Sequence, residues 1–292
     1  MWHESAGWFG DVLTVPITVT SREPALFVFY NNSAWDGGSV VADETDDGAI
    51  APDKAVLRHG SRATFANYTS YSKGINGLMI DVADLPGTPG VDDFLFRKGN
   101  NDRPYGDDLA NPADDWPCAP DPIVVTVRRG AGRNGADRVT LVWQDGAVRN
   151  CWLQVTILAT DTTGLAQDYV FYVGNAVGDS GNSAADTAVN VVDALGVRAN
   201  PHTLLKPAPI DDAYDYNRDK QVNVQDELIV RANPTTLLTD LNLIDLTAYG
   251  GAGEGEGGAA QVVAQQVMQR AALAHRHAGG IGVVIVLHRR GG

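Results

Sequence analysis

The chain has 292 residues, enough for one large domain or for two smaller domains that each bury a core; we expect two. Its 36 acidic and 22 basic residues give a formal net charge of −14. This charge disfavours nucleic acids and anionic membrane surfaces, because it repels phosphate groups, and it favours cations as partners. The longest apolar run, IGVVIVL at 281–287, is far shorter than the roughly 20 residues that cross a bilayer, so we expect no membrane span.

The two cysteines, Cys118 and Cys151, are too few for a disulfide framework and lack the spacing of a zinc site. They form either one bridge or two separate, half-buried thiols. The first residues, MWHESAGWFGDV, contain no basic start followed by an apolar run, so we expect no signal peptide in this sequence.

Residues 1–175 have the pattern of a β-rich domain. Short runs of β-branched and aromatic residues alternate with Gly, Pro, Asn and Asp, which favours strands joined by turns. The expected strands are 12–19, 25–30, 77–82, 93–97, 123–129, 138–143, 151–158 and 169–173. The pattern indicates a mainly β fold, a β-sandwich of the immunoglobulin-like or jelly-roll type. Residues 139–158 read as a hairpin that turns near Asp145 and Gly146.

Two features of this β-rich part are candidate binding sites. Residues 36–54 carry six acidic side chains, which form either an acidic solvated loop, the interpretation we prefer, or a further calcium site. Aromatic side chains in a β-domain either stack on sugars or fill the core, and the candidates are Trp35, Tyr68, Tyr71 and Trp116.

Residues 176–246 contain an internal repeat. The stretch NVVDALGVRANPHTLL recurs as NVQDELIVRANPTTLL at a constant offset of 33 residues. A repeat at a fixed period indicates a duplicated structural unit, in this case a loop followed by a helix.

The second copy contains the segment DYNRDKQVNVQD, residues 215–226, with oxygen-bearing side chains at alternating positions. Calcium takes six to eight oxygen ligands, and a loop of this length supplies them from its first, third, fifth, seventh, ninth and twelfth positions. The candidates are Asp215, Asn217, Asp219, the backbone carbonyl of Gln221, Asn223 directly or through water, and Asp226. The familiar helix-loop-helix version has glycine at position six and glutamate at position twelve, where this loop has Lys220 and Asp226. The alternative is an acidic surface turn.

The pattern D-x-N-x-D-x-x-V-N-x-x-D followed by a helix, present in tandem over residues 176–246, resembles a type I dockerin. The resemblance implies a small EF-hand-type pair without entering helices, in which the second loop binds one Ca²⁺. In the first copy the matching positions are Asn182, Asp186, the carbonyl of Ala188, Asn190 and Asp193, whereas Ala184 occupies position three. The first loop therefore binds a second ion weakly, recruits Asp179 from upstream, or is an empty structural copy.

The β-rich part and the repeat together resemble the C-terminal region of secreted or surface proteins of planctomycete-type bacteria. The stretches that carry this resemblance are FYNNSAWDG, FANYTSYSKGINGLMIDV and GNAVGDSGNSA. It implies an extracellular or cell-surface location and no catalytic motif.

Catalytic constellations are weak in this sequence. GDSG at 178–181 is similar to the nucleophile segment of trypsin-like proteases, but the flanking residues of Ser180 and of His59 differ from that family. The six histidines contain no paired zinc motif. We expect no enzyme, with a glycoside hydrolase left open because carboxylates that flank a sugar are not visible in a sequence.

Residues 247–292 contain the glycine-rich stretch YGGAGEGEGGAA at 249–260 and read as a linker with a peripheral tail. The whole sequence predicts a non-catalytic, calcium-binding attachment or assembly module. By the dockerin resemblance, the faces around Arg198 and Arg231 dock a protein partner. Val224 and Gln225 stand where dockerins commonly carry the hydroxyls that recognise a cohesin partner. Docking on the chain's own β-domain is therefore an alternative. Further alternatives are a carbohydrate-binding or polysaccharide-degrading accessory protein, and a structural subunit of a surface layer or filament.

Overall fold

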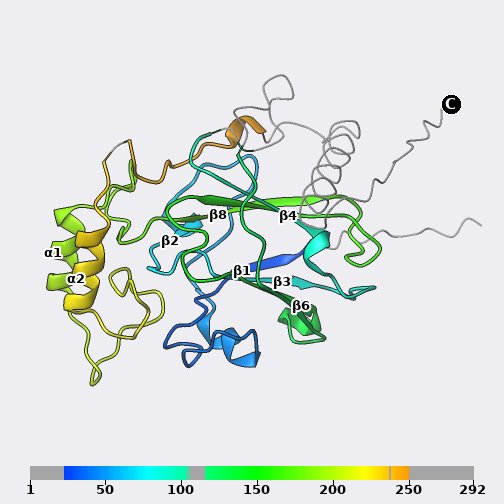
Figure 1. Cartoon of the computed structure of the whole chain (residues 1–292), viewed down its shortest axis with the longest axis horizontal. Helices are drawn as coiled ribbons and strands as arrows, with labels where there is room; N and C mark the ends of the chain where they lie inside the picture. The colour runs from blue at the N-terminus through cyan, green and yellow to red at the C-terminus, as the bar shows by residue number, and fades with distance from the viewer. Residues whose placement is uncertain (1–22, 103, 105–115, 237, 250–292) are drawn as a thin grey trace, which may run out of the picture.

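The computed structural model describes residues 23–102, 104, 116–236 and 238–249, and it is mainly β (Figure 1). Eight strands lie in this part of the chain: β1 Ala25–Val28, β2 Tyr68–Thr69, β3 Gly77–Val82, β4 Phe94–Gly99, β5 Val124–Arg128, β6 Asp137–Val142, β7 Trp152–Ile157 and β8 Tyr169–Asn175. Seven of the eight strands predicted from the sequence are present within two residues of their expected limits. The eighth, 12–19, lies outside the described residues, as do residues 250–292 of the expected tail.

The strands form two four-stranded sheets, in the orders β1-β3-β6-β5 and β2-β8-β7-β4. Every pair is antiparallel except β2 with β8, which run parallel. Each sheet therefore combines strands from distant parts of the chain.

The main hydrophobic core lies between the two sheets. Alternate residues of a strand point to opposite faces, so Leu153, Val155 and Ile157 of β7 enter this core together with Leu78 and Ile80 of β3. All five side chains are at least 98% buried. This shared core makes the two sheets a β-sandwich.

The outer faces of both sheets are covered as well. Trp152 and Tyr172 point away from the central core. They contact Leu241, Ile244 and Leu246, which follow α2 in the sequence. The indole Nε1 of Trp152 donates a hydrogen bond to the carbonyl of Asn242 at 2.7 Å. Residues 241–246 therefore pack on the β2-β8-β7-β4 sheet.

The hairpin predicted for residues 139–158 is wrong. β6 pairs with β3 and β5, whereas β7 pairs with β4 and β8 in the other sheet. Gly146 adopts the positive φ of a turn, 77°, but its amide and the carbonyl of Val148 bond to Lys73 and Ile75. The connection thus crosses between sheets, because both strands are buried on both faces and each has two partners from elsewhere.

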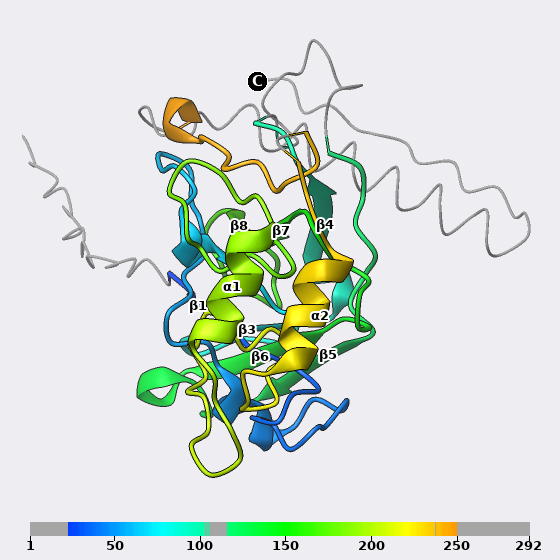
Figure 2. The same ribbon diagram turned by 90° about the vertical axis from the view of Figure 1, so that its left-hand side faces the viewer.

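Two α-helices occur in the described residues, α1 Val191–Ala199 and α2 Val224–Ala232, and they lie side by side at one end of the sandwich (Figure 2). Short 3-10 turns occur at Glu44–Ala49, Phe65–Asn67, Val91–Asp93, Arg133–Gly135 and Thr247–Tyr249. Neither α-helix has the length or apolar character of a membrane span.

The cysteines and aromatic residues resolve two of the alternatives from the sequence. Cys118 and Cys151 are both free thiols; Cys151 is half-buried as expected, whereas Cys118 is exposed. Tyr68, Tyr71 and Trp116 are at least 99% buried, so these three aromatic side chains fill cores and do not form a sugar-stacking face.

Candidate metal centre in the duplicated repeat

The two copies of the repeat build the same helix start. Asn190 and Asn223 are the N-caps of α1 and α2, and each accepts a hydrogen bond from the amide two residues on. Asp193 and Asp226 bond back to the N-cap amides and complete a capping box in each copy. The offset of 33 residues seen in the sequence is therefore an equivalence of local structure.

The backbone of the second loop, residues 215–226, bends sharply at two positions. Arg218 and Lys220, at positions four and six, have positive φ of 55° and 70°. Such angles are costly for residues with a Cβ, and position six is where the familiar loop carries its glycine. The backbone thus keeps a bend that the side chains do not favour.

Two fully buried carboxylates close this loop. Asp215 accepts bonds from the amides of Asp219 at 3.1 Å and Lys220 at 3.0 Å. Asp226 accepts bonds from the amides of Tyr216 at 2.8 Å and Asn223 at 3.0 Å. Burial raises the pKa of Asp215 to about 7 and that of Asp226 to about 6; the nearby guanidinium of Arg218 opposes the rise in the pKa of Asp215, and repulsion by Asp226 adds to it.

The other predicted ligands of this loop lie between Asp215 and Asp226 in the sequence. Asp219 accepts a bond from the amide of Gln221 at 2.8 Å, and its other oxygen accepts from the side-chain amide of Asn217 at 3.0 Å. All six predicted positions thus belong to one hydrogen-bonded turn.

The first loop differs because side-chain donors bond to its buried carboxylate, that of Asp193. Asp193 accepts from the hydroxyl of Ser180 at 2.7 Å and from the amide group of Asn182 at 2.9 Å. Asp186 accepts from the hydroxyl of Ser183 at 2.9 Å and from the amide of Ala188 at 3.2 Å. At position one the neutral Asn182 thus hydrogen-bonds directly to the carboxylate at position twelve.

Asp179, suggested as a substitute ligand for the first loop, has another partner. Its carboxylate accepts a hydrogen bond from the hydroxyl of Tyr68 in β2 at 2.5 Å and one from the amide of Gly181 at 3.2 Å. Burial is the largest cause that raises its pKa, to about 6. This residue therefore joins the repeat to the sandwich.

The oxygen donors of the second loop fit the chemistry of calcium, which prefers carboxylates, amide oxygens and backbone carbonyls. Asp215 and Asp226 are buried without a side-chain donor of the kind that Asn182 provides in the first loop. In the part of the chain that the structure describes, no three His, Cys, Asp or Glu side chains converge closely enough to hold a metal by themselves. Any ion held here would therefore also need the amide and carbonyl oxygens of Asn217, Gln221 and Asn223.

Arg218, which is not among the residues predicted from the sequence, anchors the second loop on the β-sandwich. Its side chain is 99% buried, and its guanidinium lies 4.4 Å above the ring of Tyr30 and donates to the hydroxyl at 3.2 Å. The carbonyl of the same residue accepts a bond from the amide of Ala34 at 3.0 Å. Position four of the second loop is thus inserted into the sandwich. A basic residue inside an acidic loop was the available signal.

Further contacts join the repeat to the sandwich. Lys220 places its ammonium 4.5 Å from the ring centre of Trp35, and the carbonyl of Tyr216 accepts the amide of Ser72 at 2.8 Å. On the other copy, the amide of Gly178 bonds to the carbonyl of Ser70. Both copies therefore contact the sandwich.

The outer faces of the two helices are exposed and apolar. Val191 and Leu195 on α1 are 67% and 53% exposed, and the equivalent Val224 and Leu228 on α2 are 64% and 57% exposed. We call these four side chains the apolar helix face. Because residues four apart share one side of a helix, each helix contributes one matching pair.

The two arginines named as docking candidates bind the same glutamate. Arg198 of α1 donates from Nε to Glu227 of α2 at 2.8 Å, and Arg231 pairs with Glu227 from one turn further along α2. These charges join the helices to each other at the surface.

The acidic residues of 36–54 cap turns and form ion pairs. Asp47 pairs with Arg128 and Arg138. Asp36 and Asp46 are at least 98% buried and accept backbone amides, and burial raises the pKa of Asp46 to about 6. The loop is thus more buried than a solvated acidic loop, and a calcium site there stays a prediction.

The protease-like residues do not meet. Ser180 donates to Asp193, whereas His59 bonds through Nε2 to the hydroxyl of Tyr172 at 2.8 Å. Ser180 and His59 thus have different hydrogen-bond partners.

Comparison of the chain with protein-family models, with curated proteins and with solved structures found no match. The interpretation of the site therefore depends on the residues and contacts described above.

Proposed function

We propose that the chain is a secreted or surface-attached, non-catalytic attachment or assembly protein, in which an immunoglobulin-like or jelly-roll sandwich carries a dockerin-like helix pair ordered by calcium. One observation carries this proposal: the second loop buries two carboxylates, whereas the first loop hydrogen-bonds its one buried carboxylate to side-chain donors. Burying like charges together is unfavourable unless a cation or proton neutralises them.

The chain then binds one Ca²⁺, in the second loop. Asp215, Asn217, Asp219, the carbonyl of Gln221, Asn223 and Asp226 would hold it, and the ion would neutralise the buried charge and hold the loop closed. In the first loop, Asn182 satisfies Asp193 without an ion. That loop is a structural copy that supports α1.

The helix pair then has two functional sides. Arg218 attaches one side to the chain's own sandwich, where the guanidinium is buried on Tyr30. The apolar helix face on the other side is exposed on both copies and suits a protein partner with a complementary apolar surface. Calcium would control this face by ordering the loop from which α2 starts.

The test exchanges position one between the loops in the full chain and counts bound calcium by titration calorimetry. Asp215→Asn should abolish binding, because it places an amide opposite Asp226. Asn182→Asp should create a second site, because it removes the amide that satisfies Asp193. Asp186→Asn is the matched control and should leave the count at one.

Binding that survives Asp215→Asn at full affinity would refute the assignment of the site to the second loop. Circular dichroism of the same samples shows whether each variant keeps its helices at saturating calcium. A variant without helices has failed to fold, and its loss of binding does not count for the assignment of the site. A pull-down with and without chelator, comparing wild type with Leu195→Glu and Leu228→Glu, then tests for a protein partner on the apolar helix face.

A further inference from the structure

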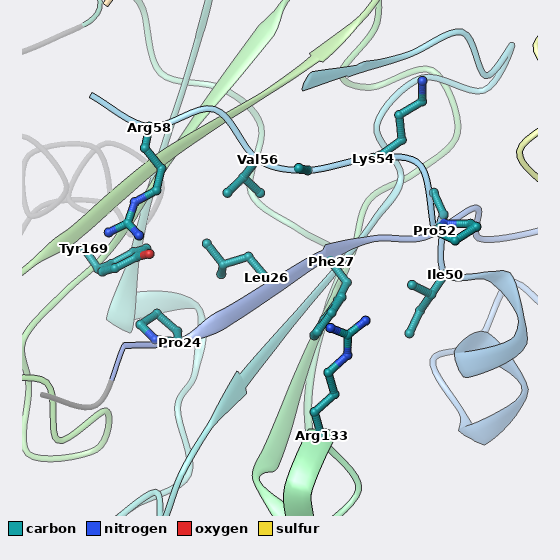
Figure 3. Close-up of a pocket in the computed structure, with 12 residues that line it drawn as sticks. Pro24, Leu26, Phe27, Ile50, Pro52, Lys54, Val56, Arg58, Arg133 and Tyr169 are labelled. Atoms are coloured by element: carbon teal, nitrogen blue, oxygen red, sulfur yellow. The ribbon is translucent and has the colours of Figure 1, made fainter. Parts of the chain in front are cut away.

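A pocket of about 420 Å³ lies beside the edge strand β1, on the sandwich and outside the repeat (Figure 3). Leu26 and Phe27 of β1 form one side, and residues 50–58 form another. Tyr169 and Arg133 come from β8 and from the turn before β6. The volume is in the range that small-molecule sites occupy.

Two guanidinium groups face this pocket, and each lies on an aromatic ring. The Cζ atom of Arg133 is 4.3 Å from the ring centre of Phe27, and that of Arg58 is 4.6 Å from the ring centre of Tyr169. Figure 3 shows them on opposite sides, with Leu26 between them. A ring contact orients a guanidinium while leaving its N–H groups free to bind an oxyanion.

The charge in the pocket is opposite to that of the whole chain. No Asp or Glu is among the described residues that line it, although the chain carries a formal charge of −14. The guanidinium of Arg133 has no carboxylate within 4.0 Å among the described residues, and Arg58 has only the exposed Glu23 at 3.8 Å. By contrast, Arg138 on the same sheet is paired with Asp81 at 2.7 Å.

Lys54 also lines the pocket but is satisfied elsewhere. Its ammonium is 2.9 Å from Asp53 and donates to the carbonyl of Phe65 at 3.0 Å. In Figure 3 its side chain points away from the space between the two arginines. The available positive charge is therefore that of Arg58 and Arg133.

We propose that this pocket binds a carboxylate-bearing ligand about the size of one sugar ring. The carboxylate would accept hydrogen bonds from Arg58, Arg133 or both, since guanidinium groups suit planar oxyanions. The body of the ligand would lie on Leu26, Pro24 and Ile50, which line the same space. The ligand is either a uronic acid unit of a polysaccharide or a free small acid. This site is separate from the calcium loops and goes beyond the proposed function.

The test uses the full chain with saturating calcium and measures binding of galacturonate, trigalacturonate and neutral galactotriose by calorimetry. At least one of Arg133→Gln and Arg58→Gln should weaken carboxylate binding tenfold or more, whereas Arg149→Gln, an exposed arginine that bonds to Asn233, should not. Binding should also weaken with salt, because the charges are near the surface. Melting temperatures of all variants confirm folding.

Tighter binding of the trimer than of the monomer supports a polysaccharide source, and equal binding supports a free acid. The proposal is overturned if neither uronate binds at millimolar concentration, if galactotriose binds equally well, or if Arg133→Gln and Arg58→Gln both leave binding unchanged.

Discussion

Replacing Arg218 with methionine tests whether the repeat is anchored through its second loop. The substitution keeps a long side chain in a position that is 99% buried but removes the charge and the donors. It leaves the hydroxyl of Tyr30 and the carbonyl of Asp212 without the bonds they receive from Arg218. An unsatisfied buried group costs about 1–3 kcal/mol, and the partly buried carbonyl of Asp212 costs less than the buried hydroxyl of Tyr30.

Two further contributions adjust this sum. Loss of the contact between the guanidinium and the ring of Tyr30, at 4.4 Å, adds about 1 kcal/mol. Removing the buried charge offsets part of this loss of stability, because a buried charge is costly and the Nε atom of Arg218 has no hydrogen-bond partner. We expect Arg218→Met to lower the free energy of unfolding by about 2–4 kcal/mol.

The assay is urea unfolding with saturating calcium, followed by tryptophan fluorescence and by helix signal. Arg58→Met is the control, because Arg58 is exposed and contacts Glu23 and Tyr169, which lie outside the repeat; it should change stability by less than about 1 kcal/mol. Combining Arg218→Met with Tyr30→Phe should give less than the sum of the single effects, since the two side chains contact each other. A loss below about 0.5 kcal/mol, or strict additivity, would refute the anchoring argument.

Two other predictions concern pH and the segment that returns to the sandwich. Without calcium, the free energy of unfolding should fall as pH rises from about 4 to about 7. The pKa of Asp215 is about 7 in the folded chain and 3.8 ordinarily. In this pH range the folded chain therefore keeps a proton that the unfolded chain loses. Urea midpoints in chelator at several pH values measure this slope, and a profile that Asp215→Asn leaves unchanged would contradict the cause. Ile244→Ala should cost about 2–4 kcal/mol, because a fully buried side chain leaves a cavity. Leu238→Ala, at a residue that is 94% exposed, is its control, and equal unfolding midpoints for the two variants would contradict the packing described.

The strands were predictable because their signal is local. The run at 77–82 is apolar enough to mark β3 to the residue. Strand pairing was not predictable from the same pattern. β6 and β7 are close in sequence and join different sheets, since each is buried on both faces and its partners come from elsewhere.

The repeat shows the same division between local and distant information. The constant offset located both loops and both helix starts, and the N-caps Asn190 and Asn223 follow it. The bond from Asn182 to Asp193 depends on a fold of the first loop that the spacing does not specify. The partner of Arg218, Tyr30, lies 188 residues away, so no local pattern indicates it.

The return of residues 241–246 to the outer face of the sandwich affects how the protein carries mechanical load. The repeat leaves the sheet at the end of β8, at Asn175, and its chain comes back to the same sheet at Leu241. A partner that pulls on α1 and α2 would therefore load both ends of the repeat in parallel, together with the anchor of Arg218 on Tyr30. Detaching the helix pair requires all of these contacts to fail, so the joint resists force better than a domain on a single linker would.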